Sequence, residues 1–452
     1  MSSYVTRKTD GDTAWFTHDR FGMFIHFGRY AMPARGEWVK TQELIAEDKY
    51  DKYMQYFNPD LFDAKEWAKK AKEAGMKYVV LTAKHHEGFC MWDSDYTDYK
   101  ITNTPFGRDL VKEYAEAFRE EGLHVGIYYS LIDWHHPLFP VDWTHPRRHD
   151  NGPEMNKTRD IKAYAEYMRN QVRELLTNYG KIDIIWFDYT YPERPIDLMP
   201  VSARTPLRYH SWAHEWMEGK SKDDWESEKL IALIRSINPD IIINNRTGID
   251  QDLWTPEQYT PTDWVKHPET GELVVWESCQ TFSGKWGYHR DEMSWKSPKM
   301  LIELLINNVS CGGNLIMNVG PTARGNFDKR ADNALNVFAE WMKYNARSIY
   351  GCTMREPEIK EPRGTRITQS VDGKRLYIHL FEYPNGFIKL EGMGGKVDYV
   401  QFLHDASEIP FTDKQFVHMG DTVSGEKDND VVINVPKMVP NQVVPVIEIF
   451  LK

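Results

Sequence analysis

The sequence predicts an α/β fold, a (β/α)8-like (TIM-type) barrel followed by a small C-terminal β-sandwich domain. Three observations predict it. Short apolar runs alternate with amphipathic helical segments from residue 20 to about 350, and nearly every run ends in a polar side chain capable of catalysis. After Gly351 the helical pattern stops and short alternating strands take over. We therefore expect a catalytic barrel over 1–350 and a β-sandwich over 351–452.

The barrel strands are expected in seven apolar runs. Each is almost continuously hydrophobic, which is typical of parallel strands covered by helices on both faces. The runs are 21–28, 77–86, 124–130, 182–188, 240–246, 273–278 and 314–321. A barrel of eight strands therefore contains one strand that this pattern misses. An open doubly wound sheet is the alternative, although the first run lacks the GxGxxG turn of dinucleotide-binding sheets.

Amphipathic helices are expected between the strands. Residues 58–75 begin with a capping signal and end at glycine, and residues 108–122 end in the same way. Further helices are expected over 160–180, 224–240, 297–313 and 333–351. The connection over 189–223 is long and rich in aromatic residues and histidine, which predicts an ordered wall over the active site.

The last hundred residues have the sequence pattern of a small all-β domain. Short strands with alternating polarity are separated by turn residues. They are expected over 373–384, 386–393, 396–406, 428–436 and 443–452.

Composition and charge exclude several classes of protein. The net charge of −11 and the lack of a Lys/Arg run argue against nucleic-acid partners. The four cysteines are widely spaced, without CxxC or zinc-type His spacing, so we expect reduced thiols and no metal site. No stretch resembles a signal peptide or a membrane span, which favours a cytoplasmic protein with no membrane partner. A chain trimmed of its leader would look the same, and a homo-oligomer is compatible with the sequence.

Polar side chains at the strand ends point to the position of the active site. In a (β/α)8 barrel the carboxyl ends of the strands and the following loops form the catalytic face. The strand-end residues are His26, His85, His86, Tyr128, Asp188, Asn245, Arg246, Glu277 and Asn318. A single polar residue at a strand end can simply cap the strand. Seven strands that all end in such residues indicate one shared active site.

Asp188 suggests the chemistry of that site. It ends the buried strand 182–188, where a lone charge must be paired, solvated or used. Carboxylates beside His, Tyr, Trp and Arg suit glycoside hydrolysis, in which one carboxylate attacks and a second acid releases the alcohol. A metal-dependent hydrolase that uses His26, His85, His86 and Asp188 is the alternative. Such barrels usually carry HxH on the first strand, whereas IHFG has one histidine.

The motifs together resemble a known family. They are RFGMFIHFGRYAMPARGEWV, KYVVLTAKHHEGFCMWDS, RDLVKEYAEAFREEGLHVGIYYS, IDIIWFDY, INPDIIINNR, VVWESCQTFSGKWGYHR and VSCGGNLIMNVGPTARG. In this order, over residues 15 to about 351, they closely resemble the α-L-fucosidases of glycoside hydrolase family 29. The resemblance implies a barrel plus a β-domain and an exo-acting retaining hydrolase without cofactor. Its substrate would be a fucosylated oligosaccharide or glycoconjugate.

The resemblance also implies roles for particular residues. Asp188, at the end of the WFD motif, corresponds to the nucleophile of a double displacement. The fucose pocket would be lined by His26, Glu37, Trp38, His85, His86, Tyr128, Trp186, Arg246 and Trp286. Adjacent strand residues point to opposite faces, so both histidines of the HH pair reach a ligand only if their strand has ended.

The general acid/base has two candidates. Glu257 lies on a loop shortly after the N-x-R strand end, where family members often carry this residue, and we prefer it. Glu277, expected at the end of the run 273–278, would then hydrogen-bond or orient its neighbours, or pair with Arg246 or Arg290. Two other functions stay open at this point. These are an α-L-galactosidase on the same scaffold and a non-catalytic sugar-binding protein that descends from an enzyme.

Overall fold

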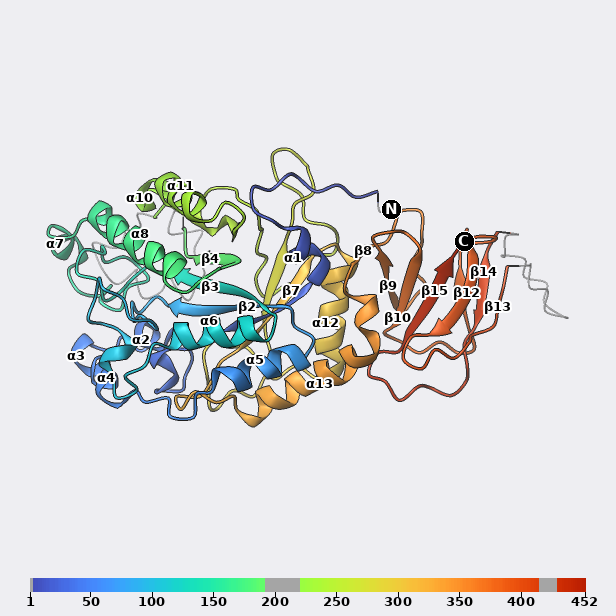
Figure 1. The fold of residues 1–452 in the computed structure, drawn as a ribbon, viewed down its shortest axis with the longest axis horizontal. Coiled ribbons are helices and arrows are strands. Elements are labelled where there is room, and N and C mark those ends of the chain that lie inside the picture. Colours follow the sequence, from blue (N-terminus) through green and yellow to red (C-terminus); the bar gives the residue numbers. More distant parts are fainter. Residues whose placement is uncertain (1–2, 192–219, 414–428) are drawn as a thin grey trace.

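The computed structural model describes residues 3–191, 220–413 and 429–452. A curved parallel sheet with surrounding helices occupies one end of the molecule, and antiparallel strands occupy the other (Figure 1). Helices α12 and α13 lie between the two parts, and α12 packs against strands β8 and β9. Within the described residues, no helix is long and apolar enough to cross a membrane.

Seven parallel strands form the main sheet. They are β1 (Phe21–Ile25), β2 (Tyr78–Lys84), β3 (His124–Ser130), β4 (Ile184–Asp188), β5 (Ile242–Ile243), β6 (Glu277–Thr281) and β7 (Asn314–Val319). Their order is β5-β4-β3-β2-β1-β7-β6, so the first strand pairs with both the second and the seventh. This is the order of strands around a barrel, and it confirms the predicted barrel over the doubly wound alternative.

The strand that the sequence pattern misses is an irregular segment over 253–258. Isolated parallel bridges join Leu253 to Asn244 after β5 and Glu257 to Cys279 in β6. The segment reads LWTPEQ, and its proline and polar residues interrupt both the hydrophobic run and a regular ladder. It lies between the two edges of the seven-stranded sheet and closes the barrel.

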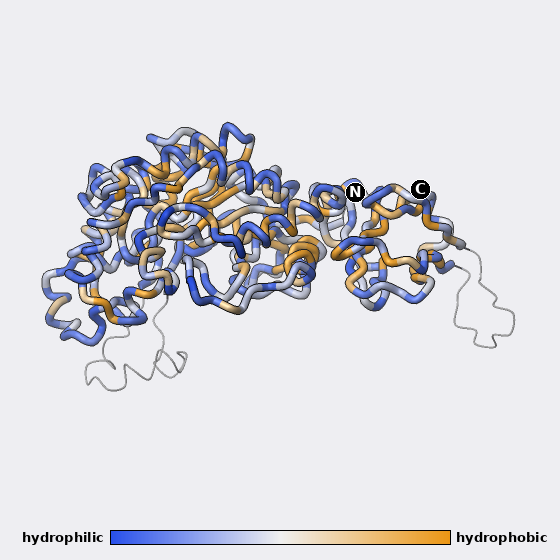
Figure 2. Tube along the Cα trace, turned by 90° about the horizontal axis from the view of Figure 1, so that it is seen from below, coloured by the Kyte–Doolittle hydropathy of each residue, from blue (hydrophilic) through white to orange (hydrophobic). Residues whose placement is uncertain are grey.

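Both faces of the barrel strands are buried, as their continuous hydrophobicity predicts. Phe21, Met23 and Ile25 of β1 belong to the large core formed with the helices, whereas Phe24 points into the barrel. The barrel interior is filled by residues from most strands: Phe24, Tyr78, Val80, Tyr128, Ile184, Trp186, Ile242, Leu253, Val275, Cys279 and Ile316. Figure 2 shows hydrophobic residues concentrated in the inner segments of the molecule and hydrophilic residues along the outer ones.

The helices follow the predicted segments with local corrections. They are α1 (Ala14–Asp19), α2 (Val39–Gln42), α3 (Glu47–Tyr50), α4 (Lys52–Tyr56), α5 (Ala64–Glu73), α6 (Leu110–Glu120), α7 (Gly152–Asn156), α8 (Ile161–Thr177), α10 (Lys222–Trp225), α11 (Ser227–Ile237), α12 (Pro298–Ser310) and α13 (Lys329–Asn345). Short 3-10 turns are η1 (Arg29–Ala31), η2 (Ile101–Asn103), η4 (Asn245–Thr247) and η5 (Ala346–Ser348). The helix expected over 224–240 is broken, because Glu226 has φ +50 and separates α10 from α11.

The antiparallel strands form two sheets. The larger has the order β12-β15-β10-β9-β8 and the smaller β11-β14-β13. Their bounds are β8 (Cys352–Met354), β9 (Thr365–Ser370), β10 (Arg375–Leu380), β11 (Phe387–Leu390), β12 (Val397–Phe402), β13 (Phe411–Thr412), β14 (Val431–Asn434) and β15 (Val446–Leu451). Side chains of both sheets, among them Ile378 and Ile433, share one hydrophobic core, which confirms the predicted sandwich.

Candidate active site

The carboxyl ends of β2, β3, β4 and β5 bring the expected polar residues together. Asp188 is the last residue of β4, and its Oδ2 accepts a hydrogen bond of 2.8 Å from the Tyr128 hydroxyl in β3. Its Oδ1 accepts a hydrogen bond of 2.8 Å from Arg246, in the turn η4 after β5. His86 follows the end of β2, and its Nε2 lies 3.8 Å from Asp188 Oδ2. Both oxygens of the carboxylate are therefore held in a fixed orientation.

Arg246 joins the two carboxylates of the predicted reaction. One of its terminal nitrogens binds Asp188, and the other lies 2.7 Å from Glu257 Oε2. Its guanidinium carbon lies 4.5 Å from the centre of the Trp186 ring, an attractive cation–π contact. The nearby carboxylates, Asp188 first, outweigh the effect of burial and raise the pKa of Arg246, so its charge is permanent.

Three buried histidines form one wall of the site. Burial lowers the pKa of His26 and His86 to about 3 and that of His85 well below its ordinary value. All three rings are therefore neutral at physiological pH. Strand β2 ends at Lys84, which frees both His85 and His86 from strand alternation, as the sequence argument requires. His85 Nδ1 is buried without a partner among the described residues.

Hydrogen bonds determine which nitrogen of His26 and His86 carries the proton. His26 Nδ1 lies 2.5 Å from Asn318 Oδ1, and the Asn318 amide nitrogen donates to the Trp286 carbonyl. His86 Nδ1 lies 2.7 Å from the Ser130 hydroxyl, which itself donates to a backbone carbonyl. Both Nδ1 atoms are therefore donors, and both Nε2 atoms are free to accept from a ligand hydroxyl.

The remaining predicted pocket residues lie beside these histidines. The Trp286 ring centre is 5.1 Å from that of His26, and the Trp38 ring centre is 4.9 Å from that of His86. The buried Glu37 accepts a hydrogen bond of 2.7 Å from the backbone of Gly287, and burial raises its pKa. The structure thus places His86, Tyr128 and Arg246 against Asp188. The other expected pocket residues follow through ring contacts and, for Glu37, through the backbone next to Trp286.

Glu277 does not lie where the sequence argument placed it. It begins β6 instead of ending a strand, and it pairs in register with Asn314, the first residue of β7. The Tyr78 hydroxyl donates to its carboxylate, and no ion pair with Arg246 or Arg290 forms. Burial raises the pKa of Glu277 to about 8, although Tyr78 and Trp186 act against this. The expected position at the barrel mouth is therefore wrong, because the ladder starts later than the hydrophobic run.

Sequence reasoning left three supporting residues out of the pocket. Asn318 and Ser130 orient His26 and His86, and Tyr189 lies against His86 with ring centres 5.0 Å apart. Asn318 lies within the run 314–321 and is already among the strand-end residues, and Tyr189 directly follows the run 182–188, so both positions were a usable signal. Most of the aromatic connection 189–223 lies outside the described residues, so its role as an ordered wall over the active site stays a prediction.

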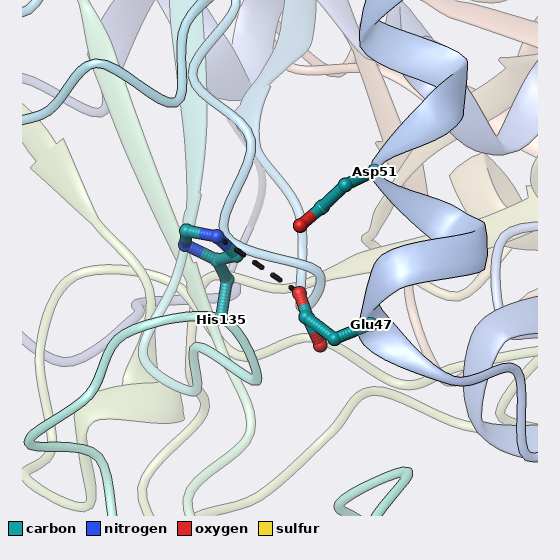
Figure 3. A group of neighbouring side chains, drawn as sticks. All are labelled: Glu47, Asp51 and His135. Carbon is teal, nitrogen blue, oxygen red and sulfur yellow. Dashed lines mark ion pairs between the residues drawn. The ribbon is translucent and has the colours of Figure 1, made fainter.

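Within the described chain, one group of acidic and histidine side chains is close enough together to ligate a metal ion, and it does not include His26, His85, His86 or Asp188. It consists of Glu47, Asp51 and His135, whose side chains point toward one another in Figure 3. Cations already approach both acids, with Lys40 2.9 Å from Glu47 and Arg29 3.9 Å from Asp51. Charge neutralisation explains the group without an ion.

Comparisons with known proteins agree with this geometry. A family model described as Alpha-L-fucosidase matches residues 3–347. The alpha-L-fucosidase of Dictyostelium discoideum is 26% identical over 96% of this chain and 91% of its own length. Human plasma alpha-L-fucosidase is 29% identical over 75% of this chain and 69% of its own.

Solved structures extend the similarity to both parts of the fold. Alpha-L-fucosidase isoenzyme 1 from Paenibacillus thiaminolyticus is 40% identical with a TM-score of 0.84, and covers 97% of this chain and 98% of its own. A GH29 alpha-L-fucosidase from Bacteroides thetaiotaomicron, described as a trapped covalent intermediate, is 26% identical with a TM-score of 0.77. It covers 100% of this chain and 98% of its own. With a matching family model over most of its length and the expected residues around Asp188, this chain belongs to the alpha-L-fucosidase family, glycoside hydrolase family 29.

Proposed function

We propose that this protein is an exo-acting, retaining α-L-fucosidase that releases terminal fucose from fucosylated oligosaccharides or glycoconjugates. The observation that carries the proposal is the Arg246 guanidinium, which binds Asp188 through one nitrogen and Glu257 through the other. Retaining glycosidases need two carboxyl groups on either side of the scissile bond. A related structure described as a trapped covalent intermediate supports the double-displacement route.

Asp188 is the proposed nucleophile. The Tyr128 hydroxyl and Arg246 each hold one of its oxygens at 2.8 Å, so the carboxylate meets the anomeric carbon along a defined line. Attack forms an ester between an Asp188 oxygen and the sugar and breaks the bond to the leaving oxygen. In the second step water cleaves the ester and restores the carboxylate.

Glu257 is the proposed acid/base. It lies on the irregular closing segment of the barrel, and its side chain is 41% exposed, so it can move toward the leaving oxygen. In the first step it donates a proton to that oxygen, and in the second it accepts one from water. Glu277 has neither this exposure nor this neighbourhood, and we assign it a supporting role inside the barrel.

Neutral histidines suit the hydroxyl groups of the sugar. Nε2 of His86 and Oδ2 of Asp188 are both acceptors and lie 3.8 Å apart, so a sugar hydroxyl can donate to either of them. His26 Nε2 and the unpartnered His85 ring offer further sites. The aromatic faces of Trp38, Trp186 and Trp286 suit the C6 methyl group of fucose.

Activity measurements test the proposal. Asp188→Ala should abolish hydrolysis of an aryl α-L-fucoside, and NMR of the first product from wild-type enzyme should show retained α configuration. Azide should restore turnover to Glu257→Ala on an activated substrate and leave Glu277→Ala unaffected. An inverted product, or an active Asp188→Ala, would refute the mechanism. Azide rescue of Glu277→Ala alone would exchange the roles of the two glutamates.

A further inference from the structure

A cluster of aromatic side chains begins at Tyr189, the residue directly after the catalytic aspartate. We call Trp38, Trp143, Tyr189 and Tyr191 the aromatic wall. The Tyr189 ring centre lies 5.3 Å from those of Trp38 and Tyr191, and 6.5 Å from that of Trp143. All four side chains are only partly buried. The wall thus begins next to Asp188 and, through Trp143 and Tyr191, includes residues outside the expected fucose pocket.

The backbone of Tyr189 is strained. It follows Asp188 directly and has φ +79, the left-handed region that bulky side chains rarely adopt. Such strain is retained where the surrounding structure imposes it, and it is concentrated at functional sites. Here the conformation turns the Tyr189 ring toward Trp38 and His86, whose ring centres lie 5.3 and 5.0 Å away. A glycine would adopt this backbone without strain, so this position holds an aromatic ring at a conformational cost.

A buried group of hydrogen bonds around Asp142, called the brace here, fixes the loop that carries Trp143. The preceding residue, Asp142, is 3% exposed and accepts hydrogen bonds from the Tyr191 hydroxyl, Lys220 and the backbone nitrogen of Thr144. The Lys220 ammonium lowers the pKa of Asp142 against the effect of burial, so the brace stays charged. Trp143 is therefore held on a rigid loop before any ligand arrives, which reduces the entropy lost on binding.

We propose that the aromatic wall is the binding site for the first sugar of the leaving group, a pyranose that stacks its C–H face on Trp143 and Tyr189. This rests on the proposed function, because Asp188 places the anomeric carbon and the leaving oxygen next to Tyr189. Amphipathic aromatic rings present a flat apolar face together with a polar edge, which matches a pyranose. The enzyme would then prefer oligosaccharides over fucosides with small leaving groups.

Two substrates distinguish an effect on binding of the leaving group from an effect on the reaction at the fucose. α-L-Fucosyl fluoride has a single atom as its leaving group and offers no second sugar to Trp143 and Tyr189, whereas a fucosylated disaccharide does. Wild-type enzyme, Trp143→Ala, Tyr189→Gly and Tyr189→Phe are compared on both substrates. Tyr344→Ala is the control, since this tyrosine is 38% exposed on α13.

The ratio of kcat/KM for the disaccharide to that for the fluoride should fall about tenfold in Trp143→Ala and Tyr189→Gly. It should stay at the wild-type value in Tyr189→Phe, which keeps the ring, and in Tyr344→Ala. An unchanged ratio in Trp143→Ala and Tyr189→Gly would overturn the proposal while leaving the proposed function intact. A wild-type enzyme that hydrolyses neither substrate would refute the proposed function itself.

Discussion

Glu277→Gln removes a carboxyl group whose protonation is coupled to folding. The side chain is 1% exposed, and burial raises its pKa from an ordinary 4.5 to about 8. Between these values the folded chain keeps a proton that the unfolded chain has released. The stability contributed by this proton is therefore fully present below about pH 4.5 and is lost as the pH rises through about 8.

The size of the effect follows from the pKa. Each pH unit inside this window changes the free energy of unfolding by about 1.4 kcal/mol. Between pH 5 and pH 8 the free energy of unfolding of the wild-type protein should therefore fall by about 4 kcal/mol relative to that of Glu277→Gln. For 452 residues the entropy of unfolding is about 0.95 kcal/mol per kelvin, so the difference in Tm should change by about 4 °C.

Thermal unfolding of both proteins at pH 5, 6, 7 and 8, followed by circular dichroism, measures this difference. Glu116→Gln, at an exposed position of α6, is the control for a Glu-to-Gln change outside the barrel interior. Glu277→Gln should also keep turnover at neutral pH, because glutamine can still accept the hydrogen bond from Tyr78. If the Tm values of wild type and Glu277→Gln fall in parallel from pH 5 to pH 8, Glu277 is not protonated in the folded protein and the reasoning is refuted.

Three further outcomes are expected. Arg246→Lys should lower kcat/KM about 100-fold, because lysine cannot bind Asp188 and Glu257 through two planar nitrogens; a loss under fivefold would contradict the bridging role. Asn318→Ala should raise KM about tenfold with a smaller change in kcat, since His26 loses the partner that orients its ring; an unchanged KM would argue against this. A chelator should leave turnover of an aryl fucoside unchanged in a steady-state assay, and a loss restored by added metal would reopen the metal-dependent alternative.

Local patterns in the sequence were sufficient to identify most of the barrel and the centre of its site. A strand buried on both faces must be hydrophobic at nearly every position, so runs such as 182–188 are visible without a structure. The residue that ends such a run lies at the catalytic face, which made Asp188 predictable. The family resemblance then indicated the histidines and Arg246, which the structure places around it.

The tertiary structure decided what depends on pairing between distant segments. The sequence cannot show that the ladder of β6 starts at Glu277, because register is set by contacts with β7 and β2. Nor can it show that the segment 253–258 closes the barrel and places Glu257 beside Arg246, since this strand has no hydrophobic run. The positive φ of Tyr189 likewise follows only from the packing around it.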